Sequence, residues 1–282
     1  MEEWSEESLH DGLRIKIRID KMLFDSKTEH QRLQLFESRR FGRVLTLDGV
    51  VQTTESDEFI YHEMMAHLPI LAHGKARRVL IIGGGDGGMA EEVLKHKSVE
   101  HVTMVEIDAG VVEFSKQYLP DICKNAFDDP RLNLVIADGA KFLAETEERF
   151  DVAIIDSTDP IGPAEVLFTE TFYGNVKRCL NEGGVVATQN GVPFLQGGEL
   201  RSTLAAFRKL FRDPTCYLAA VPTYFGGPMA FGWGTDDASL RQVPEEMLAE
   251  RFAAAGIKTR YYTPAIHKAA FALPPYVQDM IE

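Results

Sequence analysis

The residues that are best suited to take part in a reaction follow a short apolar segment at residues 152–155. The stretch Asp156-Ser157-Thr158-Asp159-Pro160-Ile161-Gly162-Pro163 places two carboxylates there, in a loop stiffened by two prolines. One aspartate at such a place would more often be a turn or cap residue. Two of them, joined by Asp86 and Glu106 from neighbouring strand ends, crowd negative charge that costs energy unless a cation binds. The pattern predicts a site for a multiply cationic substrate.

A second motif runs Gly83-Gly84-Gly85-Asp86-Gly87-Gly88 between the apolar segment 79–82 and a predicted helix. Glycines let the backbone approach a ligand closely. Glu106 ends the next apolar segment, 21 residues after Gly85, where a carboxylate can accept hydrogen bonds from ribose hydroxyls. An adenosine-type site is predicted, although NAD and S-adenosylmethionine both fit it. Asp138-Gly139, after the third segment, either contacts the adenine amine or caps a helix.

The elements that position these motifs alternate along the chain from about residue 75. Apolar strands are expected at 79–82, 102–107, 134–137, 152–155 and 185–188, with helices starting near 89, 110, 140 and 169. This alternation predicts an α/β protein with a Rossmann-like, doubly wound, mostly parallel sheet. Segments 216–221 and 229–235 flank a Gly-Gly-Pro turn and should add antiparallel strands at its edge.

The first part of the chain has a different pattern. Leu13, Ile15, Ile17 and Ile19 alternate with polar residues, a second strand begins at Leu33, and Asp48-Gly49 separates two β-prone runs as in a hairpin. A small antiparallel β domain is therefore predicted over residues 1–55, and a catalytic domain over 56–282. A helix with apolar residues on one face should follow residue 57.

Composition excludes several classes of protein. The 282 residues carry a net charge of −13, which disfavours nucleic acid and anionic membranes as partners. The longest aliphatic run, 79–82, is far short of the roughly 20 residues of a membrane span, and the acidic start does not resemble a secretory signal. Three cysteines without Cys-x-x-Cys spacing suggest neither disulfides nor a metal cluster. A cytoplasmic protein without a metal site is expected.

Taken together, these motifs make the sequence similar to the spermidine synthases, a family of polyamine aminopropyltransferases. The resemblance covers nearly the whole chain. The matching stretches are 42–55, 57–64, the turn 83–88, 105–108, 156–163, 222–224 and 261–273.

The resemblance implies a methyltransferase-like fold and transfer of an aminopropyl group from decarboxylated S-adenosylmethionine to putrescine, giving spermidine and methylthioadenosine. Decarboxylated S-adenosylmethionine would be a co-substrate, with no permanently bound cofactor, in a homodimer or homotetramer. Asp156 would accept the proton. The remaining site residues implied are, for the nucleoside, Gln31, Gly83, Gly85, Glu106, Asp138, Gly139 and Pro163, and, for the amines, Tyr61, His62, Asp86, Ser157, Asp159 and Tyr224.

Some questions stay open at this point. Certain relatives carry a Glu two residues after the Gln that ends the fifth strand, whereas this chain has Gly191, so the choice among putrescine, cadaverine, spermidine and agmatine is undecided. The segment 157–168 is either a mobile lid or a static loop. Alternative functions are an NAD-dependent oxidoreductase, a methyltransferase or a non-catalytic polyamine-binding protein. Asp86 argues against a methyltransferase, because it would repel the carboxylate of intact S-adenosylmethionine.

Overall fold

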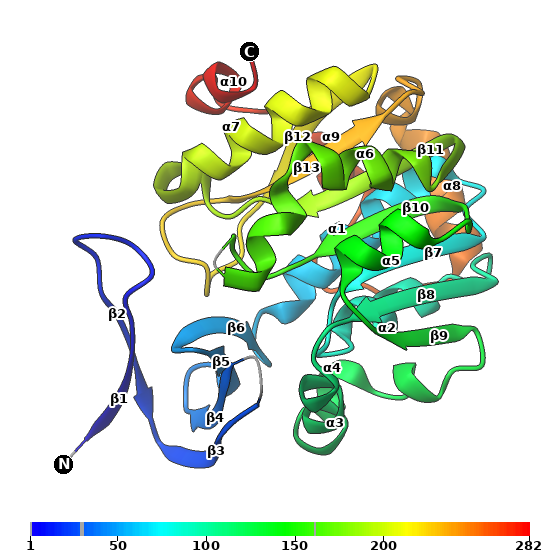
Figure 1. The fold of residues 1–282 in the computed structure, drawn as a ribbon. Coiled ribbons are helices and arrows are strands. Elements are labelled where there is room, and N and C mark those ends of the chain that lie inside the picture. Colours follow the sequence, from blue (N-terminus) through cyan, green and yellow to red (C-terminus); the bar gives the residue numbers. More distant parts are fainter. Residues whose placement is uncertain (1, 29–30, 161) are drawn as a thin grey trace.

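The protein is built around a seven-stranded sheet, seen in a computed structural model that describes residues 2–28, 31–160 and 162–282, with backbone only at Gly162 and Pro163 (Figure 1). The strand order is β12-β13-β11-β10-β7-β8-β9, and the five strands from β11 to β9 are parallel. Antiparallel β13 and β12 extend one edge, as predicted. The strands are β7 (Arg78–Gly83), β8 (His101–Glu106), β9 (Leu132–Ile136), β10 (Phe150–Asp156), β11 (Leu180–Gln189), β12 (Asp213–Ala219) and β13 (Met229–Thr235).

Helices cover both faces of this sheet, so its central strands are apolar on both sides. Val79, Ile81 and Ile154 pack against the helices of one face, which are α1 (Glu58–His73), α2 (Gly88–Leu94), α8 (Glu245–Ala255) and α9 (Pro264–Ala270). Leu80 and Ile155 face the other set, α5 (Gly139–Glu145), α6 (Glu170–Arg178), α7 (Pro193–Leu210) and α10 (Pro275–Ile281). The predicted doubly wound, Rossmann-like fold is confirmed.

The strand order reverses between β7 and β10. In open parallel sheets, ligands bind outside the carboxyl ends of the strands at such a point. Here those ends carry the glycine turn after β7 and Asp156 at the end of β10. The fold therefore brings together the two motifs that the sequence singles out.

A smaller antiparallel sheet stands beside these strand ends (Figure 1). Its hairpin turns at Asp48 and Gly49, both with positive φ, as the Asp-Gly pair predicts. Leu35 and Leu45 pack on Phe114 of the neighbouring helices, α3 (Ala109–Tyr118) and α4 (Pro120–Cys123). The strands are β3 (Lys21–Lys27), β4 (Arg32–Ser38), β5 (Gly42–Leu47) and β6 (Val50–Thr54).

A two-stranded hairpin of β1 (Glu3–Glu7) and β2 (Ile15–Ile19) precedes this sheet and projects from the body of the molecule (Figure 1). Its second strand starts at Ile15 and not at Leu13, because the chain turns through residues 11–12. Short 3₁₀ turns complete the fold: η1 (Ala126–Asp128), η2 (Gly162–Phe168) and η3 (Leu240–Gln242). No helix within the described residues is both long and apolar enough to span a bilayer.

Candidate active site

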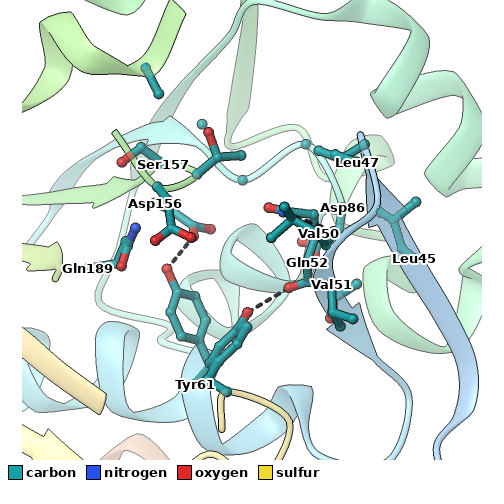
Figure 2. A pocket seen from close by; sticks show the side chains of 18 of the residues that line it. Leu45, Leu47, Val50, Val51, Gln52, Tyr61, Asp86, Asp156, Ser157 and Gln189 are labelled. Atoms are coloured by element: carbon teal, nitrogen blue, oxygen red, sulfur yellow. Dashed lines mark hydrogen bonds between the residues drawn. The ribbon is translucent and has the colours of Figure 1, made fainter. Parts of the chain in front are cut away.

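A cavity of about 430 Å³ opens at the carboxyl ends of β7, β8, β10 and β11. Strands β5 and β6 of the small sheet close one side of it, and Figure 2 shows Leu45, Leu47, Val50 and Val51 there. Among the described residues, no lysine or arginine lines the cavity. Its carboxyl side chains are Glu7, Asp48, Asp57, Glu58, Asp86, Glu106, Asp138, Asp156 and Asp159. This concentration of carboxylates favours cationic ligands.

Asp156 faces the cavity from the end of β10 (Figure 2). Tyr61 of α1 donates a hydrogen bond from its hydroxyl to Asp156 Oδ1 over 2.6 Å. Burial raises the pKa of Asp156 to about 6, with Asp86 adding to the rise and His62 and the Tyr61 hydrogen bond opposing it. A carboxylate with this pKa is mostly ionised at neutral pH, yet it can take up a proton during a reaction.

His62, one residue further along α1, is a cation inside the cavity wall. Its Nδ1 lies 2.7 Å from Glu58 Oε2, and its Nε2 lies 3.6 Å from Asp86 Oδ2. Burial alone would lower the pKa of His62, but Asp86 and Glu58 outweigh it and raise the pKa to about 10. The negative charge of Asp86 is thus partly met by the protein itself, which the sequence analysis did not foresee.

Asp86 lies in the glycine turn, across the cavity from Asp156 (Figure 2). Its Oδ1 accepts a hydrogen bond of 2.9 Å from the backbone N–H of Gly88 at the start of α2. Burial raises the pKa of Asp86, while His62 and this backbone hydrogen bond lower it. Asp86 and Asp156 therefore present two carboxylates to one space, as predicted.

The glycines of the turn fit against the protein itself. A β-carbon at Gly83 would overlap the carbonyl oxygen of Asp156, and one at Gly88 would overlap the His62 ring. A β-carbon at Gly85 would lie 2.8 Å from Val111 Cγ1 and 3.0 Å from Glu106 Oε2. Glycine is thus required at these positions even before a ligand is considered.

Glu106 marks the end of the cavity next to β8. Its Oε1 accepts a hydrogen bond of 2.9 Å from the backbone N–H of Asp108, and burial, the largest cause, raises its pKa to about 7. Gln31, which directly precedes β4, reaches the same place and donates to Asp108 Oδ2 over 3.2 Å. Both residues line the cavity.

Asp138 caps α5, the alternative that the sequence left open. Its Oδ1 accepts hydrogen bonds from the backbone N–H groups of Ala140 and Lys141, at 2.8 and 3.1 Å. The residue also lines the cavity beside Gly139, so the two interpretations are compatible. Pro163 belongs to η2, but its side chain falls outside the described part of the structure.

Tyr224 contributes a second aromatic ring, 6.0 Å from that of Tyr61. Its hydroxyl donates to the backbone oxygen of Gln52 in β6 over 2.6 Å. The loop before it is held by Asp57, which is buried and accepts hydrogen bonds from Thr54 Oγ1 at 2.7 Å and from the backbone N–H of Thr223 at 2.7 Å. Asp57 thus fixes Tyr224 relative to α1.

The loop after Asp156 contributes Ser157 and Asp159 to the cavity. Ser157 Oγ is buried, and it has no hydrogen-bond partner among the described residues. Asp159 Oδ1 accepts a hydrogen bond of 2.9 Å from Gln196 Nε2. The loop continues into η2, with Ile161 outside the described residues, and its role as a lid stays a prediction.

Sequence reasoning missed several residues that line the cavity: Gln52, Asp57, Glu58, Gln189 and Gln196. The spacing of Glu58 and His62, four residues apart on a helix, was a readable signal. Gln196 offered none, because its position depends on how α7 packs.

Fold and site together define a Rossmann-like protein with its ligand cavity at the carboxyl ends of the parallel strands, here lined by nine carboxyl side chains and, among the described residues, by no lysine or arginine. Residues 58–243 match the family model described as the spermine/spermidine synthase domain, and residues 3–55 match the spermidine synthase tetramerisation domain. The chain belongs to the spermine/spermidine synthase family.

Curated relatives agree with this assignment. The chain is 66% identical over 279 residues to a polyamine aminopropyltransferase of Ruegeria sp. (strain TM1040), covering 99% of this chain and 98% of the relative. It is 61% identical to polyamine aminopropyltransferase 1 of Pseudomonas aeruginosa, covering 98% and 96%.

Solved structures show the same likeness. One is a spermidine synthase in complex with the transition-state analogue AdoDATO, with a TM-score of 0.93 and 35% identity over 99% of this chain and 94% of that one. Another is the spermidine synthase of Thermotoga maritima, with a TM-score of 0.90 and 34% identity over the same shares. The predicted family and enzyme class, an aminopropyltransferase of polyamine biosynthesis, are confirmed.

Proposed function

We propose that this enzyme transfers the aminopropyl group of decarboxylated S-adenosylmethionine to putrescine, releasing spermidine and methylthioadenosine. The observation that carries the proposal is the cavity itself, where carboxylates line the wall and no lysine or arginine does so among the described residues. Both substrates carry positive charge, on ammonium groups and on the donor's sulfonium. The AdoDATO complex of a relative with the same fold supports a nucleoside-bearing donor.

The nucleoside part of the donor is assigned to the end of the cavity beside β8. Glu106 and Gln31 offer oxygen and amide groups there, and Asp138 lines the same wall. Glu106 would accept hydrogen bonds from the ribose hydroxyls. The complete proposed set is Gln31, Gly83, Gly85, Glu106, Asp138, Gly139 and Pro163.

The amine groups are assigned to the opposite part of the cavity. Asp86 would hold the donor's ammonium, and Asp156 the attacking nitrogen. Tyr61 and Tyr224 supply aromatic faces for the methylene chain, and a cation–π contact contributes about 0.5–2 kcal/mol. His62, Ser157 and Asp159 complete the proposed set of amine-binding residues.

Asp156 is proposed as the proton acceptor. An alkyl ammonium resembling that of lysine has a pKa of about 10.4, so the attacking nitrogen arrives protonated. The neighbouring sulfonium lowers the pKa of that amine by like-charge repulsion. The nitrogen loses a proton to Asp156 and forms a bond to the donor's methylene carbon, while the carbon–sulfur electron pair leaves with the sulfur. No covalent enzyme intermediate is needed.

One assay tests this function against the alternatives. The enzyme is given putrescine with decarboxylated S-adenosylmethionine, S-adenosylmethionine or NAD, and products are followed by mass spectrometry. Methylthioadenosine and spermidine should form only with the decarboxylated donor. Methylated amine or reduced NAD would support a methyltransferase or an oxidoreductase, and absence of any product would support a binding protein.

Replacement of Asp156 by Asn tests the proposed acceptor. Loss of a general base typically lowers turnover by about 10²–10⁴-fold. Affinity for methylthioadenosine should change by no more than a few fold, because the substitution keeps the size of the side chain and the backbone contact of Asp156 with the glycine turn. The measurements are steady-state kinetics and calorimetry. Near-normal turnover would remove Asp156 from this role.

A homo-oligomer, dimeric or tetrameric, is proposed to form through the β1–β2 hairpin. This hairpin projects from the body (Figure 1), and Trp4 on it is 48% exposed. The family model that covers it is described as a tetramerisation domain. Light scattering should give the mass of a dimer or tetramer, and Trp4→Glu should reduce that mass. The predicted cytoplasmic location awaits cell fractionation.

A further inference from the structure

Gln196 lies where α7 departs from helical geometry. Its φ of −119° and ψ of 30° interrupt the helix, which otherwise runs from Pro193 to Leu210. Gln196 lines the cavity together with Gln189, Gly191 and Val192. The start of α7 thus forms a part of the cavity wall to which the proposed function has assigned no role.

The Gln196 amide is held on every side. Its Nε2 donates to Asp159 Oδ1 at 2.9 Å and to Glu199 Oε1 at 3.1 Å, and its Oε1 accepts from the backbone N–H of Val192 at 3.0 Å. One amide therefore separates two carboxylates and fixes the direction of Asp159. A group held by this many bonds has a defined position, as a size-selective wall requires.

The Gln196 amide fills the space beside Gly191. The φ of Gly191 is +60°, and a β-carbon added there would lie 2.5 Å from Gln196 Oε1. Gln196 therefore occupies the space into which a side chain at residue 191 would project. The cavity wall at this point is therefore formed by Gln196.

Glu199 lies directly behind the amide. Its Oε2 is buried and has no hydrogen-bond partner among the described residues. Burial and the nearby Asp159 raise the pKa of Glu199 to about 7. A carboxyl group in this state gains from any cation that reaches it, and Gln196 stands between it and the cavity.

We infer that Gln196 is the specificity-determining residue for amine length: it closes the amine end of the cavity, orients Asp159 toward the far ammonium of putrescine, and keeps longer amines from Glu199. This inference rests on the proposed function and deepens it. Gln196 acts on the far ammonium through Asp159 and through its own bulk, away from the reacting nitrogen.

The test compares putrescine with cadaverine, which is one methylene longer. A pocket that discriminates one methylene typically gives about a 10–200-fold difference in kcat/KM. In Gln196→Ala we expect the preference for putrescine to fall to about threefold or less. The KM for putrescine should rise about tenfold while kcat stays within about threefold, because the reacting groups are untouched.

Gly191→Ala tests the same part of the cavity wall independently, because the added methyl group would displace the Gln196 amide. It should shift the amine preference in the same direction in the wild-type background. In the Gln196→Ala background it should have no further effect on preference. Gly256→Ala is the matched control, since Gly256 has a φ of +63° and a β-carbon there meets nothing within 4 Å.

The possible outcomes distinguish the role of Gln196 from the proposed function. If the wild-type enzyme is active and Gln196→Ala has the same preference among amines, the inference is overturned and the proposed function stands. A wild-type enzyme that forms no methylthioadenosine with any diamine would overturn both. Binding of methylthioadenosine by Gln196→Ala, measured by calorimetry, should match wild type, and its loss would mean that Gln196 has a structural role, against the inference.

Discussion

Replacement of Asp86 by Asn should weaken the choice between the two possible donors. Intact S-adenosylmethionine carries a carboxylate beside its ammonium, and decarboxylated S-adenosylmethionine does not. At about 4 Å and an effective dielectric near 20, two unit charges interact by roughly 4 kcal/mol. The His62 imidazolium, 3.6 Å from Asp86, and residual water offset part of this. If about half of this energy remains, Asp86 repels the carboxylate of intact S-adenosylmethionine by about 2 kcal/mol, which corresponds to roughly 30-fold in affinity.

The assay is calorimetric titration of both donors into wild type and Asp86→Asn. We expect the ratio of their dissociation constants to fall by roughly 30-fold in the variant. The pKa of His62 should also fall below its value of about 10, because Asp86 is the charge that raises it most, and an NMR titration can follow this. Asp121→Asn, on the exposed side of α4, controls for loss of one charge. An unchanged ratio in Asp86→Asn would refute the electrostatic reasoning.

Two further results are expected. Burial raises the pKa of Asp156 to about 6, and the proposed mechanism needs its carboxylate. The value of kcat/KM for putrescine should therefore decline as the pH falls through about 6, by up to tenfold per pH unit. A pH profile that stays flat below pH 6 would contradict the assignment of Asp156 as proton acceptor. Asp57→Ala should lower the free energy of unfolding by about 3 kcal/mol, because it leaves the buried hydroxyl of Thr54 and the partly buried backbone N–H of Thr223 without their acceptor. A urea-denaturation loss under about 1 kcal/mol would show that water replaces the carboxylate.

The central sheet could be predicted because its strands are covered on both faces. Such strands are continuous apolar runs, as at 79–82, and they alternate with helices of regular spacing. β1 was not predicted because its sequence, Glu3–Glu7, has no alternation of its own and depends on pairing with β2. α7 was missed because Gly197 and Gly198 interrupt its apolar pattern. Packing against the sheet stabilises it in spite of them.

The site was predictable where chain neighbours carry the chemistry. Asp86, Glu106 and Asp156 end or follow strands, and parallel strands bring such ends together. Contacts between distant segments could not be read in the same way. Gln196 meets Asp159 across 37 residues, and this contact depends on the kink in α7. The charge of His62 could be predicted only in part, because Glu58 lies four residues away on the same helix, whereas Asp86 is brought to His62 by the fold.

The contact between Gly83 and the Asp156 carbonyl joins the part of the site proposed to bind the nucleoside to the residue proposed to accept the proton. The backbone N–H of Gly84 donates to that carbonyl at 3.1 Å, so the glycine turn and Asp156 share one rigid junction. A methyl group at residue 83 would displace the acid as well as the turn. Randomising the turn to admit new donors should therefore also move Asp156, the proposed proton acceptor, and the two positions have to be varied jointly.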